Sequence, residues 1–439
     1  MPPLGFDMAL VSPLYRFHQQ AEASLTAYGP EVVARPEGSP GEASAGGVLV
    51  EIVETFGQLD VEYAALRKSC VVIDQPNRAV LEVTGGERVG FLNRMLTQEL
   101  KGLGPGDVRR SFWLSRKGRV DGDLRVMACE DRVLLEVDVH AAARTCAGLG
   151  AYVISEDVEI RDVTGAVHRL AFHGPGSAEV VAGLLPASGE AIRGLRPGRA
   201  CEVRLGGAAG LVFREDSTGE AGMELILPLA EVVGFYQRAV ELFGDDDRGE
   251  GVRLRPAGWH AFNVARIEAG TPLYNLDFGV ESLPAETGVL HDRVSFTKGC
   301  YLGQEIVARM QARRQLKQQL VAVRFEPATD PATGIACQAV TGATLYASAE
   351  DGAKGSTTAG QTLEEAISGD GGGGASSGGW QPVGVVTSSA ISPMLGAIPI
   401  AFAQVKSSHA AAGTRLVCGL EGTAMAGGVR DSLCFWRRA

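Results

Sequence analysis

The chain has 439 residues, 45% of them hydrophobic and 21% charged, the composition of a globular protein long enough for two or three domains. No apolar run approaches the roughly 20 residues that a membrane-spanning helix needs, so we expect no membrane segment. The formal net charge of -11 argues against bulk binding to DNA or RNA, although it leaves room for a local basic face.

The eight cysteines are scattered, without a CxxC pair and without the Cys/His spacing of a metal site. We therefore expect free thiols in a reducing compartment and no bound metal. The N-terminus lacks the basic region and apolar core of a secretory signal, and it makes a poor transit peptide. The expected location is cytoplasmic, with an organelle as the alternative if a presequence has been removed. The cysteines are Cys70, Cys129, Cys146, Cys201, Cys300, Cys337, Cys418 and Cys434.

The first part of the chain is expected to alternate strands and helices after an N-terminal extension. Residues 1–47 are interpreted as an arm or linker with a short helix near 14–28. Apolar runs at 79–83 and 133–137 predict strands. Apolar side chains at helical spacing predict a helix over 87–100.

The interval 166–249 repeats this alternation and ends at an acidic break. Beyond residue 320, short segments with turn signals predict a β-sandwich or β-barrel. The Gly-rich interval 350–380 interrupts it, and we expect this interval to be disordered. The expected helices of this part cover 177–185, 229–243, 258–268 and 304–320, and the expected strands 320–325, 343–347, 383–387 and 398–405.

Residues 298–309, KGCYLGQEIVAR, bring together a thiol, an ammonium group and a carboxylate where the last helix is expected to begin. Free backbone N–H groups and the dipole of a helix start, together with Lys298, would favour the thiolate form of Cys300. The alternative is a turn that holds a buried and inert cysteine, since buried cysteines are common.

This stretch resembles the signature of the YgfZ-type folate-binding proteins, which support assembly or repair of iron–sulfur proteins. That family is related to the glycine-cleavage T-protein, an aminomethyltransferase. The resemblance implies an α+β fold with three domains around a central folate channel, the last a β-barrel. It implies a first, folate-binding domain at 48–165 plus 250–318, a second α/β domain at 166–249 and the barrel at 319–439. It leaves residues 1–47 unmatched and places the family's signature thiol on Cys300.

Residues 116–124, RKGRVDGDL, gather three cations and two carboxylates around two glycines, which by itself predicts a charged hairpin turn. In the T-protein family the matching stretch ends in Asp-Asp-Leu and carries the catalytic aspartate beside the reactive folate nitrogen. By this resemblance Asp123 is a candidate catalytic residue and a candidate folate contact. Gly122 replaces the first aspartate, as is usual in the YgfZ-like branch, and this argues against aminomethyl transfer.

Residues 214–224 resemble the T-protein motif Tyr-Thr-Gly-Glu-x-Gly-x-Glu, with Ser217 in place of the tyrosine. One carboxylate can accept hydrogen bonds from both the 2-amino group and the N3–H of a pterin. Glu220 and Glu224 are therefore candidates for binding the folate head. Without the resemblance, the same residues predict a loop that enters a strand.

Arg266 lies in a stretch similar to the family's Arg-x-Glu-x-Gly segment, where the arginine neighbours the folate site. It would meet a carboxylate of the glutamyl tail or only tie the helix end to its neighbours. Lys298 completes the candidate cofactor-binding set. Residues 283–288 also fit the family pattern, in a structural role.

A group of cations follows Cys300 at helical spacing: Arg309, Arg313, Arg314 and Lys317. Such a group is commonly a solvated face. The alternative is a local patch for a polyanion, such as a polyglutamylated folate tail, tRNA or an acidic partner protein.

Three functions remain open at this point. The first is a folate-binding protein that uses tetrahydrofolate and Cys300 to support an iron–sulfur client or assembly partner. A lone cysteine cannot hold a cluster, so that role would need a partner. The second is a folate-dependent aminomethyl- or methyltransferase with Asp123 as its active carboxylate. The third is a scaffold that has kept only the fold. We favour the first.

Overall fold

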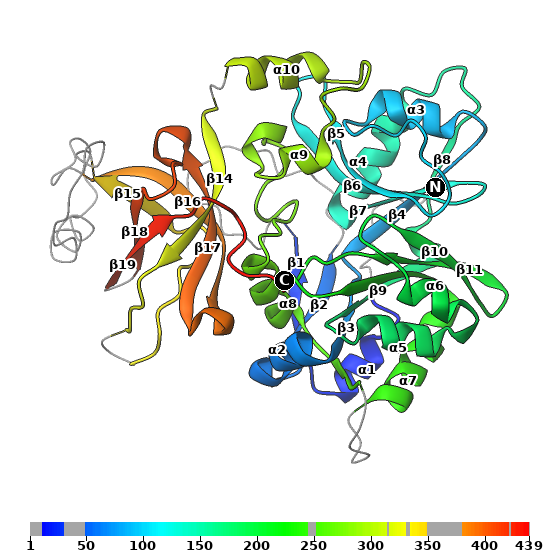
Figure 1. The fold of residues 1–439 in the computed structure, drawn as a ribbon, viewed down its shortest axis with the longest axis horizontal. Helices are drawn as coiled ribbons and strands as arrows, with labels where there is room; N and C mark the ends of the chain where they lie inside the picture. Colours follow the sequence, from blue (N-terminus) through cyan, green and yellow to red (C-terminus); the bar gives the residue numbers. More distant parts are fainter. Residues whose placement is uncertain are drawn as a thin grey trace, which may run out of the picture.

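The computed structural model describes residues 11–29, 49–244, 252–313, 316–330, 334–348, 380–420 and 423–438. These residues form two large β-sheets that lie together, a small two-stranded sheet and a closed six-stranded barrel beside them (Figure 1). The mixed architecture with a C-terminal barrel confirms the expected fold class. In the described part of the chain, no helix is both long and apolar enough to cross a bilayer.

The first sheet has five antiparallel strands in the order β5-β6-β7-β4-β8. Helices α3 and α4 cover one face, where Phe91, Leu92 and Leu135 are fully buried. The charged segment 116–119 forms the turn between β5 and β6, which confirms the predicted hairpin. The elements are β4 (Arg78–Thr84), α3 (Arg88–Met95), β5 (Val108–Leu114), β6 (Val120–Ala128), β7 (Val133–Asp138), α4 (Val139–Gly150) and β8 (Glu159–Asp162).

The second sheet has six strands in the order β10-β11-β12-β9-β3-β13. Its outer face is buried under α5 and α7 through residues such as Val180, Phe172 and Phe235. The elements are β3 (Cys70–Asp74), β9 (Val167–His173), α5 (Ser177–Leu184), α6 (Gly189–Arg193), β10 (Ala200–Leu205), β11 (Ala208–Arg214), β12 (Gly222–Pro228), α7 (Val232–Phe243) and β13 (Leu254–Pro256).

The sheet topology differs from the predicted domain division. Strand β3 lies in the part assigned to the first domain, yet it pairs antiparallel with β9 and parallel with β13 in the second sheet. The strand is buried throughout, so it needs partners on both edges and a cover on both faces. Strand β3 therefore belongs to the second sheet, whereas Val50 and Ile52, which also precede β4, pack in the core of the first sheet.

The two sheets pack on each other through one apolar interface and one charged interface. Val80, Met127 and Leu134 of the first sheet contact Leu211 and Phe213 of the second. Farther along the same faces, charged residues replace these side chains and a pocket opens between the sheets. This arrangement follows from the two-residue period of a strand, which sets every second side chain of β6 toward the other sheet.

The N-terminal extension is not a free arm where the structure describes it. Instead of one helix near 14–28, the chain forms α1 (Tyr15–Gln20) and then β1 (Ser24–Tyr28). Strand β1 pairs antiparallel with β2 (Val50–Thr55). His18 of α1 contacts the buried Asp74 with an Nε2–Oδ2 distance of 2.7 Å. These contacts make residues 11–29 part of the body of the protein.

Two further helices are shorter than predicted. The helix expected over 87–100 ends at Met95, because Leu96 turns to an extended conformation and bridges to Trp113 of β5. The helix expected over 304–320 is α10 (Gln304–Arg313), and residues from Gln318 onward form a barrel strand. Val321 and Val323 of that strand are buried in the barrel core. Their packing extends the strand back to Gln318, inside the stretch where the sequence predicts a helix.

The barrel closes in the order β14-β17-β16-β15-β18-β19, and all its pairs are antiparallel. Its elements are β14 (Gln318–Phe325), β15 (Thr344–Ser348), β16 (Trp380–Ser392), β17 (Ile398–Lys406), β18 (Arg415–Leu420) and β19 (Thr423–Val429). Apart from Trp380, the insertion predicted at 350–380 lies outside the described residues.

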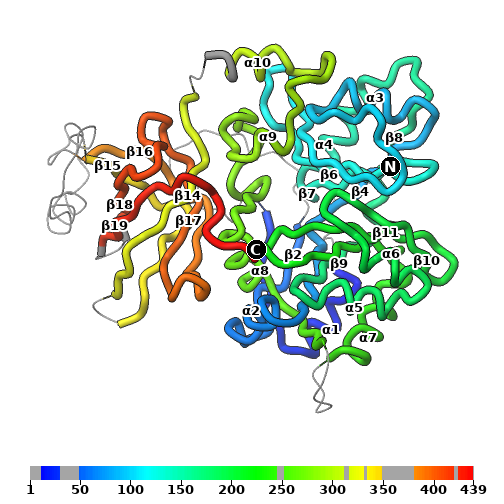
Figure 2. The backbone as a smooth tube through the Cα atoms, in the orientation of Figure 1, coloured from blue at the N-terminus to red at the C-terminus, as the bar shows by residue number. Residues whose placement is uncertain are grey.

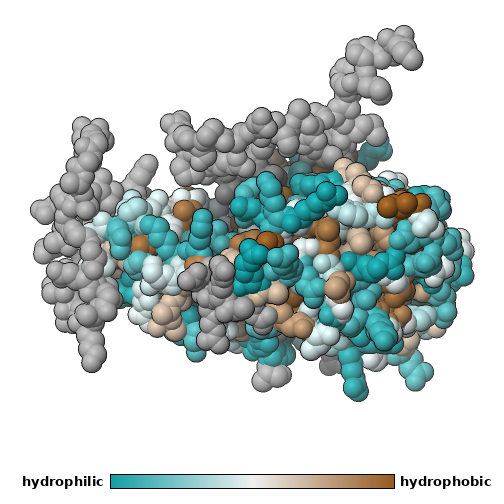
Figure 3. Space-filling model, turned by 90° about the horizontal axis from the view of Figure 1, so that it is seen from above, coloured by the Kyte–Doolittle hydropathy of each residue, from teal (hydrophilic) through white to brown (hydrophobic). Residues whose placement is uncertain are grey.

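Helix α8 (Trp259–Glu268) lies between the barrel and the second sheet, with α2 (Leu59–Lys68) beside it (Figure 1). After β19 the chain returns from the barrel to the body, as the red segment in Figure 2 shows. There the backbone N–H groups of Phe435 and Trp436 donate to the carbonyl of Glu268. Seen from above, hydrophobic residues form separate patches among hydrophilic ones (Figure 3).

Candidate functional site

A pocket that is partly open to solvent lies between the two sheets. Tyr28 of β1 and two aromatic residues of α8, Trp259 and Phe262, supply its aromatic lining. Four aliphatic residues, three uncharged polar residues and charged side chains from both sheets supply the rest. A pocket with aromatic walls and a few polar groups is the usual form of a site for a planar small molecule.

The first sheet contributes a buried ion network to this pocket. Glu136 of β7 is fully buried and accepts from Arg78 and Arg125, with a distance of 2.6 Å from Arg125 Nη1 to Glu136 Oε2. Burial alone would raise the pKa of Glu136, but the two guanidinium groups outweigh it and hold this pKa well below its usual range. Arg125 also donates to Glu215 at 2.9 Å.

The second sheet places Glu224 opposite this network. Glu224 lies on β12 and accepts from Arg169 of the neighbouring strand β9, while His173 Nε2 lies 3.4 Å from its other oxygen. Burial would raise the pKa of Glu224, but Arg169 and His173 lower it below its usual value. Glu224 is therefore an ionised acceptor on the pocket wall, and it is the only member of the predicted cofactor set that lines this pocket.

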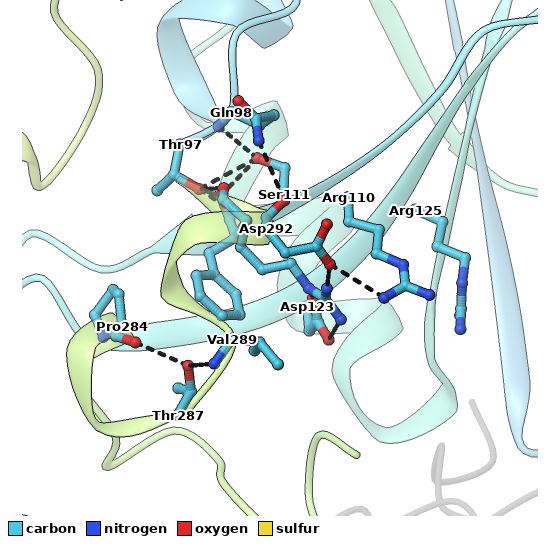
Figure 4. Close-up of polar contacts among 12 residues, drawn as sticks. Thr97, Gln98, Arg110, Ser111, Asp123, Arg125, Pro284, Thr287, Val289 and Asp292 are labelled. Carbon is cyan, nitrogen blue, oxygen red and sulfur yellow. Dashed lines mark hydrogen bonds and ion pairs between the residues drawn. The ribbon is translucent and has the colours of Figure 1, made fainter. Parts of the chain in front are cut away.

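Asp123 lies on β6, on the same strand face as Arg125 and two residues away from it. Both of its oxygens face Arg293, with distances of 2.9 Å to Nε and 3.3 Å to Nη2. Figure 4 shows Asp123 close to Asp292, whose carboxylate bonds to Arg110. Arg110 Nη1 donates to Asp292 at 3.1 Å, so the carboxylates here are already neutralised by arginines.

Two predicted folate contacts are used elsewhere in the fold. Glu220 has a fully buried side chain and accepts from Arg438 Nε of the C-terminal segment at 2.6 Å. Arg266 is buried and donates to Asp277, Asn263 and the barrel residue Ser388. Neither side chain lines the pocket, and Arg266 connects α8 to the barrel.

Lys298, also predicted as a cofactor contact, lies outside the pocket and binds backbone carbonyls. Its buried ammonium donates to the backbone carbonyls of Asn93, Leu96 and Gln98 at 2.7–2.8 Å. Burial lowers the pKa of Lys298 to about 8. An ammonium has three donors, and here all three are used, so Lys298 fastens the loop before α10 to the end of α3.

Cys300 lies between two anchors in this loop. Lys298 is buried on one side, and on the other Tyr301 is buried with its ring 5.4 Å from the Lys298 ammonium. All eight cysteines are free, and Cys300 is the one classed as exposed. Gly303, with a φ of +81°, then packs against Leu114 and Ser115 of the β5–β6 hairpin. The loop thus presents the thiol to solvent from a fixed support, which excludes the buried cysteine considered above.

The cations that follow Cys300 do not form a described cluster. Arg309 is exposed and pairs with Glu305 at 2.8 Å on the same helix. Lys317 is exposed at the start of the barrel. Arg314 lies outside the described residues, and so does the side chain of Arg313. Residues 283–288 form the turn η4 (Pro284–Glu286) and its exit, closed by a hydrogen bond from Thr287 to the Pro284 carbonyl at 2.8 Å, which agrees with their predicted structural role.

Most of the charged residues around the pocket are not among those predicted from the sequence. Arg169 stands inside the apolar strand β9, and Glu136 stands inside the apolar strand β7. A charged residue within an otherwise buried strand was the available signal, because such residues are rarely buried unless they are paired.

Comparisons with known proteins agree with this architecture. Residues 17–298 match the model of the GCVT N-terminal domain. An aminomethyltransferase of Caldanaerobacter subterraneus is 29% identical over 61% of this chain and 69% of its own length. That of Streptomyces coelicolor is 27% identical over 82% of this chain and 84% of its own length.

A solved structure has the same overall fold. The glycine cleavage system aminomethyltransferase T of Bartonella henselae superposes with a TM-score of 0.73 at 20% identity, covering 98% of this chain and 99% of the other. The match of the GCVT N-terminal domain begins at residue 17, so it includes part of the extension that the sequence analysis left unmatched.

Proposed function

The chain belongs to the family of the GCVT N-terminal domain, and from this premise we propose that it binds tetrahydrofolate between its two sheets and supports the assembly or repair of iron–sulfur proteins through Cys300. Two parts of the molecule support the proposal. The pocket supplies the folate site, and the loop before α10 supplies the thiol.

The pocket suits a pterin because it joins aromatic walls to one ionised acceptor. Glu224 can accept from the 2-amino group and N3–H of the pterin while Tyr28, Trp259 and Phe262 contact the ring system. The pairing with Arg169 does not use up Glu224, since an ionised carboxylate has about four lone-pair sites.

The exposure of Cys300 is the observation that carries the iron–sulfur role. A thiol that acts on a partner protein must reach solvent and must be held in place. Cys300 meets both needs, because Lys298 and Tyr301 anchor the loop on either side of it. Since one thiol cannot hold a cluster, its client or assembly partner would supply the remaining ligands.

Folate-dependent aminomethyl or methyl transfer is the second candidate, and the fold is consistent with it. In that reaction Asp123 would assist transfer at the folate nitrogen. Asp123 does not line the pocket between the sheets, and this counts against that role. The exposed thiol has no part in such a mechanism, so we place the transferase second.

The test is an anaerobic calorimetric titration with tetrahydrofolate, followed by a cellular assay. We expect micromolar binding by the wild type, a loss of about 10- to 100-fold in affinity for Glu224→Gln, and unchanged affinity for Cys300→Ala. In cells that lack their own YgfZ-type protein, the wild type and Cys337→Ala should restore the activity of an iron–sulfur enzyme, and Cys300→Ala should not.

The folate site and the role of Cys300 can be disproved separately. Absence of tetrahydrofolate binding by the wild type would remove the folate site. Full restoration by Cys300→Ala would remove the role of the thiol. Turnover of tetrahydrofolate with an aminomethyl donor, abolished by Asp123→Asn, would establish the transferase instead.

A further inference from the structure

Arg169 is a buried cation with unused donors on the wall of the pocket. The residue is 1% exposed, and its Nη2 donates to Glu224 and, at 3.2 Å, to Gln75. Its Nε and Nη1 have no hydrogen-bond partner among the described residues. A buried donor without an acceptor is unfavourable, so this position favours an acceptor from outside the chain.

A second unused donor lines the same pocket. Ser217, in the loop between β11 and β12, is 4% exposed, and its hydroxyl has no hydrogen-bond partner among the described residues. Ser217 and Arg169 therefore give the pocket two buried donor groups. The neighbouring Thr218 hydroxyl is also unpartnered, but Thr218 does not line the pocket.

The charges of the pocket exclude a simple anion as the occupant. Its lining has three arginines (Arg78, Arg125 and Arg169) and three carboxylates (Asp74, Glu136 and Glu224). An anionic group that approached Arg169 would also approach the Glu224 carboxylate beside it. The balanced lining instead suits a neutral group that offers an acceptor to Arg169 and donors to Glu224.

We propose that Arg169 and Ser217 recognise the 4-oxo group of the pterin and so select 4-oxo over 4-amino pterins. This rests on the proposed folate site. Along the edge of a 4-oxopterin, the 2-amino group and N3–H are donors and O4 is an acceptor. Glu224 faces the donors and the neighbouring Arg169 faces O4, so the side-by-side acceptor and donor of the pocket match a lactam edge. A 4-amino pterin would set a donor against the guanidinium of Arg169, with no acceptor for it.

The test compares tetrahydrofolate with tetrahydroaminopterin, its 4-amino analogue in the same reduced state, by anaerobic calorimetry. We expect the wild type to bind tetrahydrofolate at least about 10-fold more tightly, since a site built to bond a polar group discriminates against the analogue that lacks it. Arg169→Met should lose about 10- to 100-fold in affinity for tetrahydrofolate and little for the analogue. Discrimination between the two ligands should then fall, and what remains should come from N3, which carries a hydrogen for Glu224 only in the 4-oxo pterin.

Two further variants keep the test valid if Arg169→Met does not fold. Ser217→Ala removes one pocket donor without a large change in volume and should reduce discrimination several-fold. Thr218→Val is the matched control, because it removes an unpartnered hydroxyl outside the pocket and should leave both affinities unchanged.

The outcomes separate this inference from the function on which it rests. Equal affinity of the wild type for the two ligands overturns the role of Arg169 and Ser217 and leaves the folate site in place. Unchanged discrimination in Arg169→Met or in Ser217→Ala also counts against it. Absence of binding of either ligand to the wild type overturns both proposals.

Discussion

At the scale of single residues, Cys300 differs from the other seven cysteines in its surroundings. Cys70, Cys129 and Cys418 are buried, and burial raises the pKa of each of their thiols. Desolvation disfavours the thiolate, which is the form that reacts with alkylating agents. Cys300 is the exposed thiol of the eight.

We predict that limiting iodoacetamide modifies Cys300 before any other cysteine of the native protein. Mass spectrometry of tryptic peptides after a short reaction would identify the modified site. Denatured protein is the control, because all eight thiols should then react at similar rates. Earlier modification of Cys337 or Cys434, which are only partly exposed, would contradict the assignment of Cys300 as the accessible thiol.

At the scale of elements, the N-terminal segment depends on one buried carboxylate. Helix α1 has six residues, too few to be stable by itself in water. Asp74 of β3 accepts from Ser12 and His18 of this segment, and at 2.6 Å from His168 of β9. Burial would raise the pKa of Asp74, but the two histidines outweigh it and hold this pKa well below its usual value.

Asp74→Asn should therefore lower the free energy of unfolding by about 3 kcal/mol at neutral pH, since it weakens three buried contacts. The pKa of Asp74 is lower in the folded than in the unfolded state, where it is about 3.9. Its stabilisation is complete above that value and is lost as the pH falls through it toward the lower folded pKa. The difference between wild type and variant should thus narrow below about pH 4.

Urea unfolding at a series of pH values would measure this difference. Asp60→Asn is the control, because Asp60 is exposed on α2 and its loss should change stability by no more than about 0.5 kcal/mol. A gap between wild type and Asp74→Asn that stays constant down to pH 2 would show that the carboxylate is not the anchor of this segment.

At the scale of the whole molecule, a buried polar cluster fastens the barrel to the body. Asp277 accepts from Arg266 of α8 and from the barrel hydroxyls of Thr387, at 2.8 Å, and Ser388, at 2.6 Å. Glu268, at the end of the same helix, accepts from Ser392 of β16. Arg266 and Glu268 thus each connect helix α8 of the body to the barrel.

Arg266→Met should destabilise the protein by about 3–5 kcal/mol, because it leaves the buried Asp277 carboxylate without its cation. Loosening of the barrel should appear as faster proteolysis after α9 (Leu290–Arg293) and as a lower midpoint in urea. Folate affinity of the folded variant should change by no more than about twofold, because Arg266 lies outside the pocket.

Arg309→Met is the matched control, since Arg309 is exposed and pairs only with Glu305 in the described structure. A large loss of folate affinity in Arg266→Met with unchanged stability would restore the folate role that the sequence assigns to Arg266.

Local patterns in the sequence predict most of the helices and strands and point to the segment that holds Cys300. Helices α5, α7 and α8, the β5–β6 hairpin and four barrel strands follow from periodicity and turn residues, which act over a few neighbouring positions. Which charged residues pair with each other depends on the tertiary structure. Asp123 and Arg293 are 170 positions apart in the sequence. Strand β3 pairs with β9, which lies far from it in the sequence. Such pairings depend on burial and on strand order, so no local pattern could show that Arg266 ties the barrel down or that Arg169 lines the pocket.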